Sequence, residues 1–187
     1  MFCRKVIVIL LLNLIFLTGC SSQEIKTDLQ KNNSKSKVKF IELDSFYVTG
    51  ISRIVNSEND KHLEDINNLW ELFYQSKVTS KIEKLLSDNI YVIYSDYGSP
   101  GESDFRVTIG YKSQKNTTDN PELKAIVVDK NKYQVFSSSA VNQKALKKLY
   151  DEIEVKCKKR KYSFDFEVYE TNLLNVPKKV KLFINVF

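Results

Sequence analysis

Residues 66–73, Ile-Asn-Asn-Leu-Trp-Glu-Leu-Phe, carry apolar side chains at the spacing of one face of an α-helix. Residues 146–153, Leu-Lys-Lys-Leu-Tyr-Asp-Glu-Ile, repeat this spacing eighty positions later. The apolar positions are Ile66, Leu69, Trp70 and Phe73 in the first stretch and Leu146, Leu149, Tyr150 and Ile153 in the second. Offsets of three, four and seven predict two amphipathic helices, the first behind caps at 57–60 and the second over 141–155. The recurrence indicates an internal duplication.

Strand-like segments flank both predicted helices. Before the first helix, residues 38–55 are rich in β-branched and aromatic side chains, and after it 89–97 and 105–111 are two runs joined by Gly98-Ser99-Pro100-Gly101, which predicts a hairpin. Strands are also expected at 123–128 and 132–139, and at 163–170 and 180–187 around a turn that contains Pro177. Each half then reads strand, helix, strand, strand. This order predicts an α+β domain, with both helices on one face of a mainly antiparallel sheet.

The N-terminus has the pattern of a signal peptide. Arg4 and Lys5 precede an apolar run, 6–17, that is interrupted only by Asn13. This run is shorter than the roughly 20 residues that cross a hydrocarbon core of about 30 Å as a helix. Leu-Thr-Gly-Cys at 17–20 resembles the bacterial lipobox, which implies cleavage before Cys20 and diacylglycerol on its sulfur. An ordinary secretory signal with a chance cysteine is the alternative.

The expected organisation is a signal peptide at 1–19, a lipidated cysteine with a flexible tether at 20–37, and one domain at 38–187. The tether is polar and has too few apolar side chains to fold. The formal net charge of +6 becomes +4 once the signal leaves with two basic and no acidic residues. We therefore expect a lipoprotein that faces outside the cytoplasm, in the periplasm or on the cell surface, bound to the membrane through Cys20. Nucleic acid is not an expected partner at that location.

Residues 38–187 resemble the GyrI-like effector-binding domains, which are also found fused to bacterial transcription activators. Four pieces carry the resemblance: Leu-Trp-Glu-Leu-Phe at 69–73, Ile-Tyr-Val-Ile-Tyr-Ser-Asp-Tyr at 90–97, Phe-Arg-Val-Thr-Ile-Gly at 105–110 and Phe-Glu-Val-Tyr at 166–169. The resemblance implies two pseudo-symmetric repeats with a small-molecule cleft between them. It also implies that Glu167 lies in this cleft among aromatic side chains, where a carboxylate and ring faces suit a flat cation.

Strand alternation places Asp165, Glu167 and Tyr169 on one face of their strand, which from the pattern alone could face water. The expected ligand-binding residues are Glu167, Tyr169, Trp70, Tyr91, Tyr97, Tyr47 and Phe105. Trp70 has a core position on its helix as the alternative. Tyr91 and Tyr97 share a strand parity and Tyr94 has the other, so the three cannot all line one cleft.

A second class of function stays open, because some members of the resembled family are hydrolases that open strained electrophilic rings. Glu167 would then act as general base or acid, with Tyr169 or Tyr91 as a hydrogen-bond partner. Inhibition of gyrase conflicts with export from the cytoplasm, although an unidentified protein partner remains open.

No cofactor or metal is expected. His62 is the only histidine, and Cys157 is the only cysteine that would be neither removed nor lipidated. A site for a soft metal lacks ligands, and glycine-rich phosphate loops are absent from the sequence.

Overall fold

The computed structural model describes residues 39–58, 62–98, 103–115, 119–172 and 176–187. The predicted signal peptide, the tether and Cys20 lie outside the described residues. The bounds of the elements are β1 Lys39–Leu43, β2 Phe46–Asn56, α1 His62–Gln75, a 3₁₀ turn Val78–Lys81, β3 Leu85–Ser95, β4 Asp104–Ser113, β5 Lys124–Val128, β6 Asn131–Ser138, α2 Gln143–Lys156, β7 Asp165–Thr171 and β8 Pro177–Asn185.

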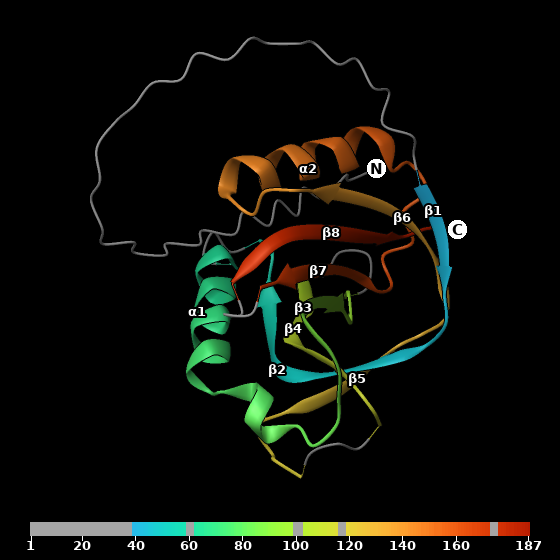
Figure 1. The fold of residues 1–187 in the computed structure, drawn as a ribbon. Coiled ribbons are helices and arrows are strands. Elements are labelled where there is room, and N and C mark those ends of the chain that lie inside the picture. Colours follow the sequence, from blue (N-terminus) through green and yellow to red (C-terminus); the bar gives the residue numbers. More distant parts are fainter. Residues whose placement is uncertain (1–38, 59–61, 99–102, 116–118, 173–175) are drawn as a thin grey trace, which may run out of the picture.

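The strands form one curled antiparallel sheet with two helices, as the sequence predicts (Figure 1). Its order is β1-β6-β8-β7-β3-β4-β2-β5. The strands of the unit β6-α2-β7-β8 lie in one half of the sheet, and those of the unit β2-α1-β3-β4 lie in the other half in the reverse spatial order. The two halves meet where β7 pairs with β3. The predicted hairpin at 89–111 is present as β3 and β4. Pro177 begins β8 opposite Thr171, so the predicted turn is shorter than its composition suggested.

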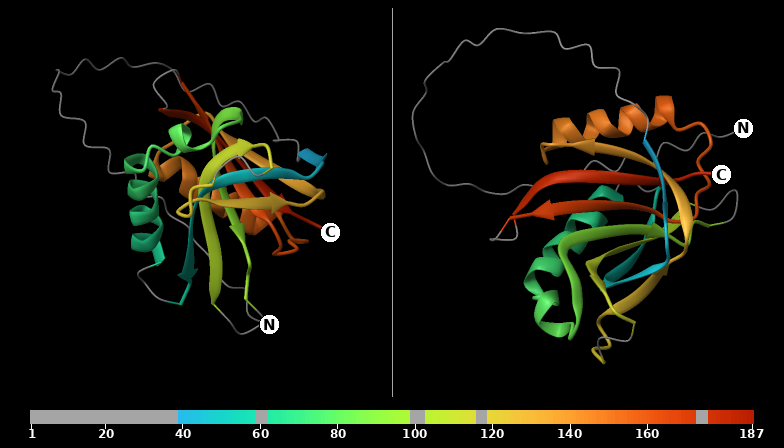
Figure 2. Two further views of the ribbon diagram at one scale, coloured as in Figure 1. Left: turned by 90° about the horizontal axis from the view of Figure 1, so that it is seen from below. Right: turned by 45° about the vertical axis from the view of Figure 1, so that its right-hand side comes forward.

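The outermost strands are exchanged between the halves. β1 pairs with β6, although β2 is its neighbour in sequence. β5 pairs with β2, although β6 is its neighbour in sequence. Leu43 pairs with Asn131 and Phe46 pairs with Val128, so both ladders share one register. The chain from β1 to β2 therefore runs as one long bent strand along the chain from β5 to β6 (Figure 2). This exchange links the two halves and curls the sheet.

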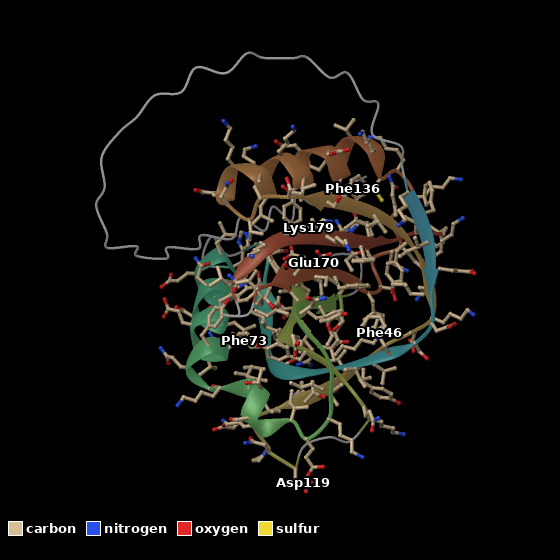
Figure 3. The ribbon with its side chains drawn as sticks, viewed as in Figure 1. Phe46, Phe73, Asp119, Phe136, Glu170 and Lys179 are labelled. Atoms are coloured by element: carbon tan, nitrogen blue, oxygen red, sulfur yellow. The ribbon has the colours of Figure 1, made fainter. Side chains whose placement is uncertain are left out.

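Both helices cover the same face of the sheet. The predicted apolar faces are buried in the larger core, including Ile66, Leu69, Trp70 and Phe73 of α1 and Leu146, Leu149 and Ile153 of α2. Figure 3 shows Phe73 between α1 and the strands. At the start of α2 the Asn142 side chain accepts a hydrogen bond of 2.9 Å from the Ala145 amide, which caps a helix end that would otherwise leave this amide unpaired.

A second core fills the inside of the curl. Phe46 of β2 contacts Phe166 of β7 edge to face, with ring centroids 5.6 Å apart, although β3 and β4 separate these strands in the sheet. Phe166 in turn stacks on Phe183 at 4.4 Å. The label of Phe46 in Figure 3 marks this inner side. These ring contacts hold the sheet in its curled form.

Two paired glycines bring β2 and β4 very close together. A Cβ at Gly50 would lie 2.0 Å from the Ile109 carbonyl oxygen, and one at Gly110 would lie 2.2 Å from that of Thr49. Both contacts are with backbone, which cannot rotate away. Larger residues at this pair would therefore force the strands apart.

Candidate ligand cavity

Glu167 lies at the centre of the sheet, on β7, and is 1% exposed. The Tyr94 hydroxyl donates to its Oε1 at 3.2 Å, and the Tyr150 hydroxyl donates to the same oxygen. The Tyr169 hydroxyl donates to Oε2 at 2.5 Å. These tyrosines come from β3, α2 and β7, so one carboxylate joins three elements and both repeats.

Burial raises the pKa of Glu167 above its ordinary value of 4.5, and the three tyrosine hydroxyls oppose part of that rise. Burial also raises the pKa values of Tyr94, Tyr150 and Tyr169 well above 10.0, and the charge of Glu167 adds to this rise. The tyrosines therefore stay protonated and act as donors. An ionised Glu167 is held by hydrogen bonds, and none of the described lysines or arginines forms an ion pair with it.

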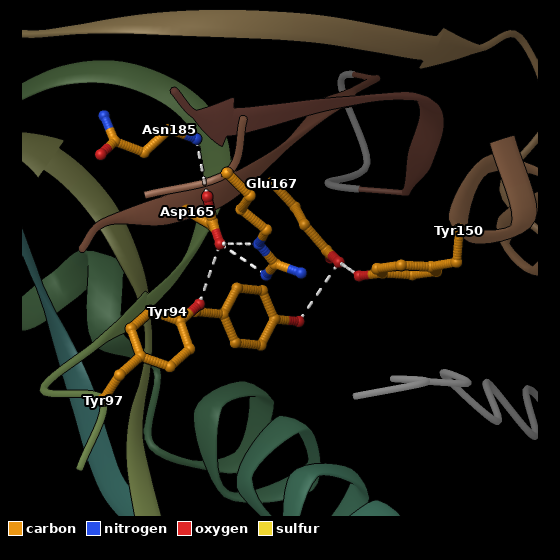
Figure 4. Close-up of polar contacts among 7 residues, drawn as sticks. Tyr94, Tyr97, Tyr150, Asp165, Glu167 and Asn185 are labelled. Atoms are coloured by element: carbon orange, nitrogen blue, oxygen red, sulfur yellow. Dashed lines mark hydrogen bonds and ion pairs between the residues drawn. The ribbon is translucent and has the colours of Figure 1, made fainter. Parts of the chain in front are cut away.

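Asp165 forms a second polar centre two residues earlier on β7. Arg160 holds its Oδ2 with Nε at 2.7 Å and a terminal guanidinium nitrogen at 2.5 Å. The Tyr97 hydroxyl donates to Oδ2 at 3.1 Å, and the backbone amide of Asn185 donates to Oδ1 at 2.7 Å. Figure 4 shows the two carboxylates, with Tyr94 and Tyr150 at Glu167 and with Tyr97 and Asn185 at Asp165. Asp165 is 2% exposed, and its charge is cancelled by Arg160.

A small cavity joins the two carboxylates. It has about 20 Å³ of room for the centre of a water molecule, which corresponds to about one water. Its lining draws on both repeats: Tyr94, Tyr97, Phe105, Tyr150, Arg160, Asp165, Phe166, Glu167, Leu182 and Ile184. The cavity therefore lies where the two halves meet, as expected.

Several of the predicted ligand-binding residues are brought together. Glu167, Tyr97 and Phe105 line the cavity, and Tyr169 bonds to Glu167. Trp70 is buried in the core behind Tyr169, with the ring centroids 5.4 Å apart and edge to face. Trp70 is thus one layer removed from the cavity, which agrees with the core position that its helical spacing allowed.

Tyr91 and Tyr47 lie elsewhere. Tyr91 packs in the inner core against Phe46, on the face of the sheet opposite Glu167. Tyr47 lies on β2, opposite Ser113 and Val127, with β3 and β4 between it and β7. Neither lines the cavity.

Tyr91, Tyr94 and Tyr97 do not all line the cavity, as expected, but Tyr97 lies with Tyr94 and not with Tyr91. Asp96 has a positive φ of 49°, a left-handed conformation that ends the alternation of β3. Tyr97 is turned by this kink toward Asp165, and so it joins Tyr94 at the cavity. Strict alternation had placed these two tyrosines on opposite faces.

Sequence reasoning missed four polar members of the site: Tyr94, Tyr150, Arg160 and Asp165. Tyr150 occupied a predicted core position of α2, where a hydroxyl surrounded by apolar neighbours needs a buried partner. Asp165 shared the face of Glu167 by alternation, which was a usable signal. Arg160 stood in a lysine-rich stretch and had no distinguishing signal.

Within the described residues, no cluster of three or more metal-ligating side chains occurs. No helix in the described ranges is long and apolar enough to cross a membrane.

Comparisons with known proteins agree with this architecture. A structure of SAV2435 bound to tetraphenylphosphonium matches with a TM-score of 0.64 and 18% identity, over 81% of this chain and 94% of that one. The Vibrio cholerae integron cassette protein VCH_CASS2 matches with a TM-score of 0.63 and 25% identity, over 81% and 97%. A Staphylococcus aureus MU50 protein described as a putative bacterial transcription regulator matches with a TM-score of 0.61 and 18% identity, over 80% and 97%.

A search of curated proteins finds no match. The model of one protein family, described as integron-associated effector binding protein, matches residues 39–186, which is nearly all of the folded part. The chain therefore belongs to the family of integron-associated effector-binding proteins, and its fold is a small-molecule effector-binding domain.

Proposed function

We propose that this domain binds a lipophilic aromatic cation, with the positive charge held against Glu167. One observation carries the proposal: Glu167 is a buried carboxylate among aromatic rings, without a lysine or arginine partner in the described part of the chain. Such a carboxylate lacks only a counter-charge. A bound cation would supply it.

Electrostatics favours this class of ligand over others. A buried carboxylate destabilises its own ionised form, and a cation placed beside it removes that cost. A cation whose charge is spread over aromatic groups has a small free-energy cost of desolvation, and the faces of aromatic rings attract it. An anion would meet the charge of Glu167, and a neutral ligand would leave that charge uncompensated.

The relative SAV2435 supports the proposal, because its structure holds tetraphenylphosphonium, a cation of this class. At 18% identity the likeness is one of fold. The argument for this chain therefore rests on its own carboxylate and rings.

Binding requires the cavity to widen, because room for about one water cannot hold an aromatic cation. Tyr150 is the donor to Glu167 that comes from a helix, whereas Tyr94 and Tyr169 stand on paired central strands. A shift of α2 would break one hydrogen bond and leave the sheet intact. We infer that the ligand enters by displacing Tyr150.

We also propose that the domain acts on a membrane surface outside the cytoplasm, held by lipid on Cys20. The support is the pattern of residues 4–20 and the polar stretch that follows it. The role would then be to sequester or carry a cationic small molecule at that surface. A protein partner would be needed only if binding is signalled onward.

The test compares tetraphenylphosphonium with tetraphenylborate, which has nearly the same shape and the opposite charge. Wild type should bind the cation and not the anion in isothermal titration calorimetry. Glu167→Gln should weaken cation binding at least tenfold. Glu170→Gln is the matched control, because it makes the same change on the same strand at a half-exposed residue paired with Lys181.

Equal binding of the cation by wild type and Glu167→Gln would refute the assignment of the site. Equal binding of the two tetraphenyl ions would refute the role of charge. If wild type instead hydrolyses an epoxide and Glu167→Gln does not, the domain is a hydrolase that uses the same carboxylate.

A further inference from the structure

We propose that the Arg160–Asp165 ion pair makes the cavity select ligands with a single positive charge, because Arg160 neutralises the second carboxylate of the cavity. This inference rests on the proposed binding of cations at Glu167 and adds a rule for their charge. It makes Arg160 a residue that determines specificity.

The charged side chains that line the cavity favour a ligand with one positive charge. Its charged side chains are Arg160, Asp165 and Glu167. Arg160 and Asp165 neutralise each other through two contacts of 2.7 and 2.5 Å. An ionised Glu167 therefore leaves the lining with a single net negative charge, which one positive charge balances.

Asp165 is placed to act as a second cation site if it were released. It lies two residues from Glu167 on the same face of β7, opposite Tyr94 in the β3 ladder. Asp165 also accepts hydrogen bonds from the Tyr97 hydroxyl and from the backbone amide of Asn185, and these two bonds would hold its carboxylate in place without Arg160. Removal of Arg160 would leave a buried, oriented carboxylate next to the cavity.

Arg160 is held firmly as the counter-charge. Its backbone forms an isolated bridge with Val186, which follows the last residue of β8, and its guanidinium lies 4.6 Å from the centre of the Tyr162 ring. Burial lowers the pKa of Arg160, but the charge of Asp165 and hydrogen bonds outweigh this and raise it, so the guanidinium stays charged. Arg160 lines the cavity, and its side chain is 21% exposed, whereas Asp165 is buried.

A dication would find its second counter-charge already occupied. It would have to expel Arg160 from Asp165 or leave one charge unbalanced in a buried site. Both are unfavourable, whereas a monocation needs neither. The same reasoning predicts that the cavity discriminates by charge between ligands with a common ring system.

The experiment uses ethidium and propidium, which share one ring system and carry one and two positive charges. Their Kd values are measured by fluorescence for the wild-type chain and for Arg160→Gln. Wild type should prefer ethidium. Arg160→Gln should shift the ratio of the two Kd values at least tenfold toward propidium, because Asp165 is then free to hold the second charge.

Two further variants separate charge from structural damage. Asp165→Asn leaves Arg160 unpaired, so it should weaken binding of both dyes at least tenfold even though Glu167 is present. The double variant Arg160→Gln/Asp165→Asn is neutral at this position and should return to the wild-type preference. If Arg160→Gln fails to fold, as judged by near-ultraviolet circular dichroism, Asp165→Asn decides instead, because unchanged binding of both dyes by that variant would overturn the inference.

An unchanged ratio in a folded Arg160→Gln variant would overturn the inference, as would a tenfold altered ratio in the double variant. The proposed function fails separately. Wild type would then bind neither dye, or Glu167→Gln would bind ethidium as tightly as wild type.

Discussion

Val92 lies directly opposite Glu167 in the ladder that joins β3 to β7, where the two repeats meet. The strands also match in sequence, since Tyr-Val-Ile-Tyr at 91–94 corresponds to Phe-Glu-Val-Tyr at 166–169. Val92 thus takes the place in the first repeat that Glu167 takes in the second. The fold is repeated but the charge is not, and the cavity at the junction has one carboxylate without a basic partner among the described residues.

The affinity for tetraphenylphosphonium should depend on pH through Glu167. This ligand does not titrate, so any change belongs to the protein. Affinity should be constant at high pH and fall by about tenfold per pH unit below the pKa of Glu167, because one proton competes with one cation. Burial raises that pKa, so the fall should begin above the ordinary range near 4.5. Calorimetry across pH measures it, and a profile flat down to pH 4 would contradict it.

The difference in folding stability between Glu167→Gln and wild type should change in favour of the variant as pH rises above 4.5. Between this ordinary value and the raised pKa of Glu167, the folded wild type keeps a proton that the unfolded chain releases. Its free energy of unfolding therefore falls with rising pH, and glutamine has no such titration. Urea denaturation at several pH values measures the difference.

Glu170→Gln is the control for that series and should behave in the opposite sense. The hydrogen bond from Lys181 lowers the pKa of Glu170, so its contribution to stability is present above the ordinary value and lost as pH falls through the lowered one. A common trend in both variants would show that the pH effect does not come from burial of Glu167.

Tyr150→Phe should move the pH profile of cation binding upward. The Tyr150 hydroxyl stabilises the ionised carboxylate, so its loss raises the pKa of Glu167 further. The midpoint of affinity against pH reports this shift. Tyr47→Phe is the matched control, because Tyr47 lies three strands from Glu167 and should leave the midpoint unchanged. A downward shift in Tyr150→Phe would contradict the role of the hydroxyl.

Leu146→Ala should lower the free energy of unfolding by about 2–5 kcal/mol. Leu146 is 1% exposed in the core that α2 shares with α1 and the sheet. Val155→Ala on the same helix should change stability by less than about 0.5 kcal/mol, since Val155 is 68% exposed. Urea denaturation of both variants measures the contrast. Equal effects would mean that the buried face of α2 is misassigned.

Cys20→Ala should abolish incorporation of radiolabelled palmitate and move the protein out of the membrane fraction, because the acyl chains provide the anchor. Cys3→Ala is the control and should stay lipidated, since Cys3 lies within the predicted signal peptide. If Cys20→Ala stays at the membrane through an uncleaved signal peptide, the absence of labelled palmitate distinguishes this from a lipid anchor. Labelled palmitate in that variant would refute the lipidation site.

Much of the fold was predictable from local pattern. The buried faces of both helices, the β3–β4 hairpin and the α+β class follow from periodicity and turn residues, which depend on neighbours in sequence. The pairing of β5 with β2 was not predictable in this way. β5 and β6 are separated by two residues and look like a hairpin, but the register that joins them to β1 and β2 is set by contacts between the two halves.

The site shows the same division. Glu167, Tyr169 and Asp165 share a face because alternation along one strand is local. Tyr150 reaches Glu167 only because α2 packs over the sheet, and Tyr97 reaches Asp165 only because Asp96 turns the chain at the end of β3. A single kinked residue reverses the outcome of an alternation argument.

By itself, the sequence determined which residues are helical and apolar, which strand carries the carboxylates, and that the chain has the two-part pattern of an effector-binding domain. Only the tertiary structure decided that Glu167 receives three tyrosine hydroxyls and that Arg160 cancels Asp165. The physical reason is that hydrogen bonds and ion pairs depend on distances of about 3 Å. Such distances between distant segments are set by packing, whereas periodicity records only which face is buried.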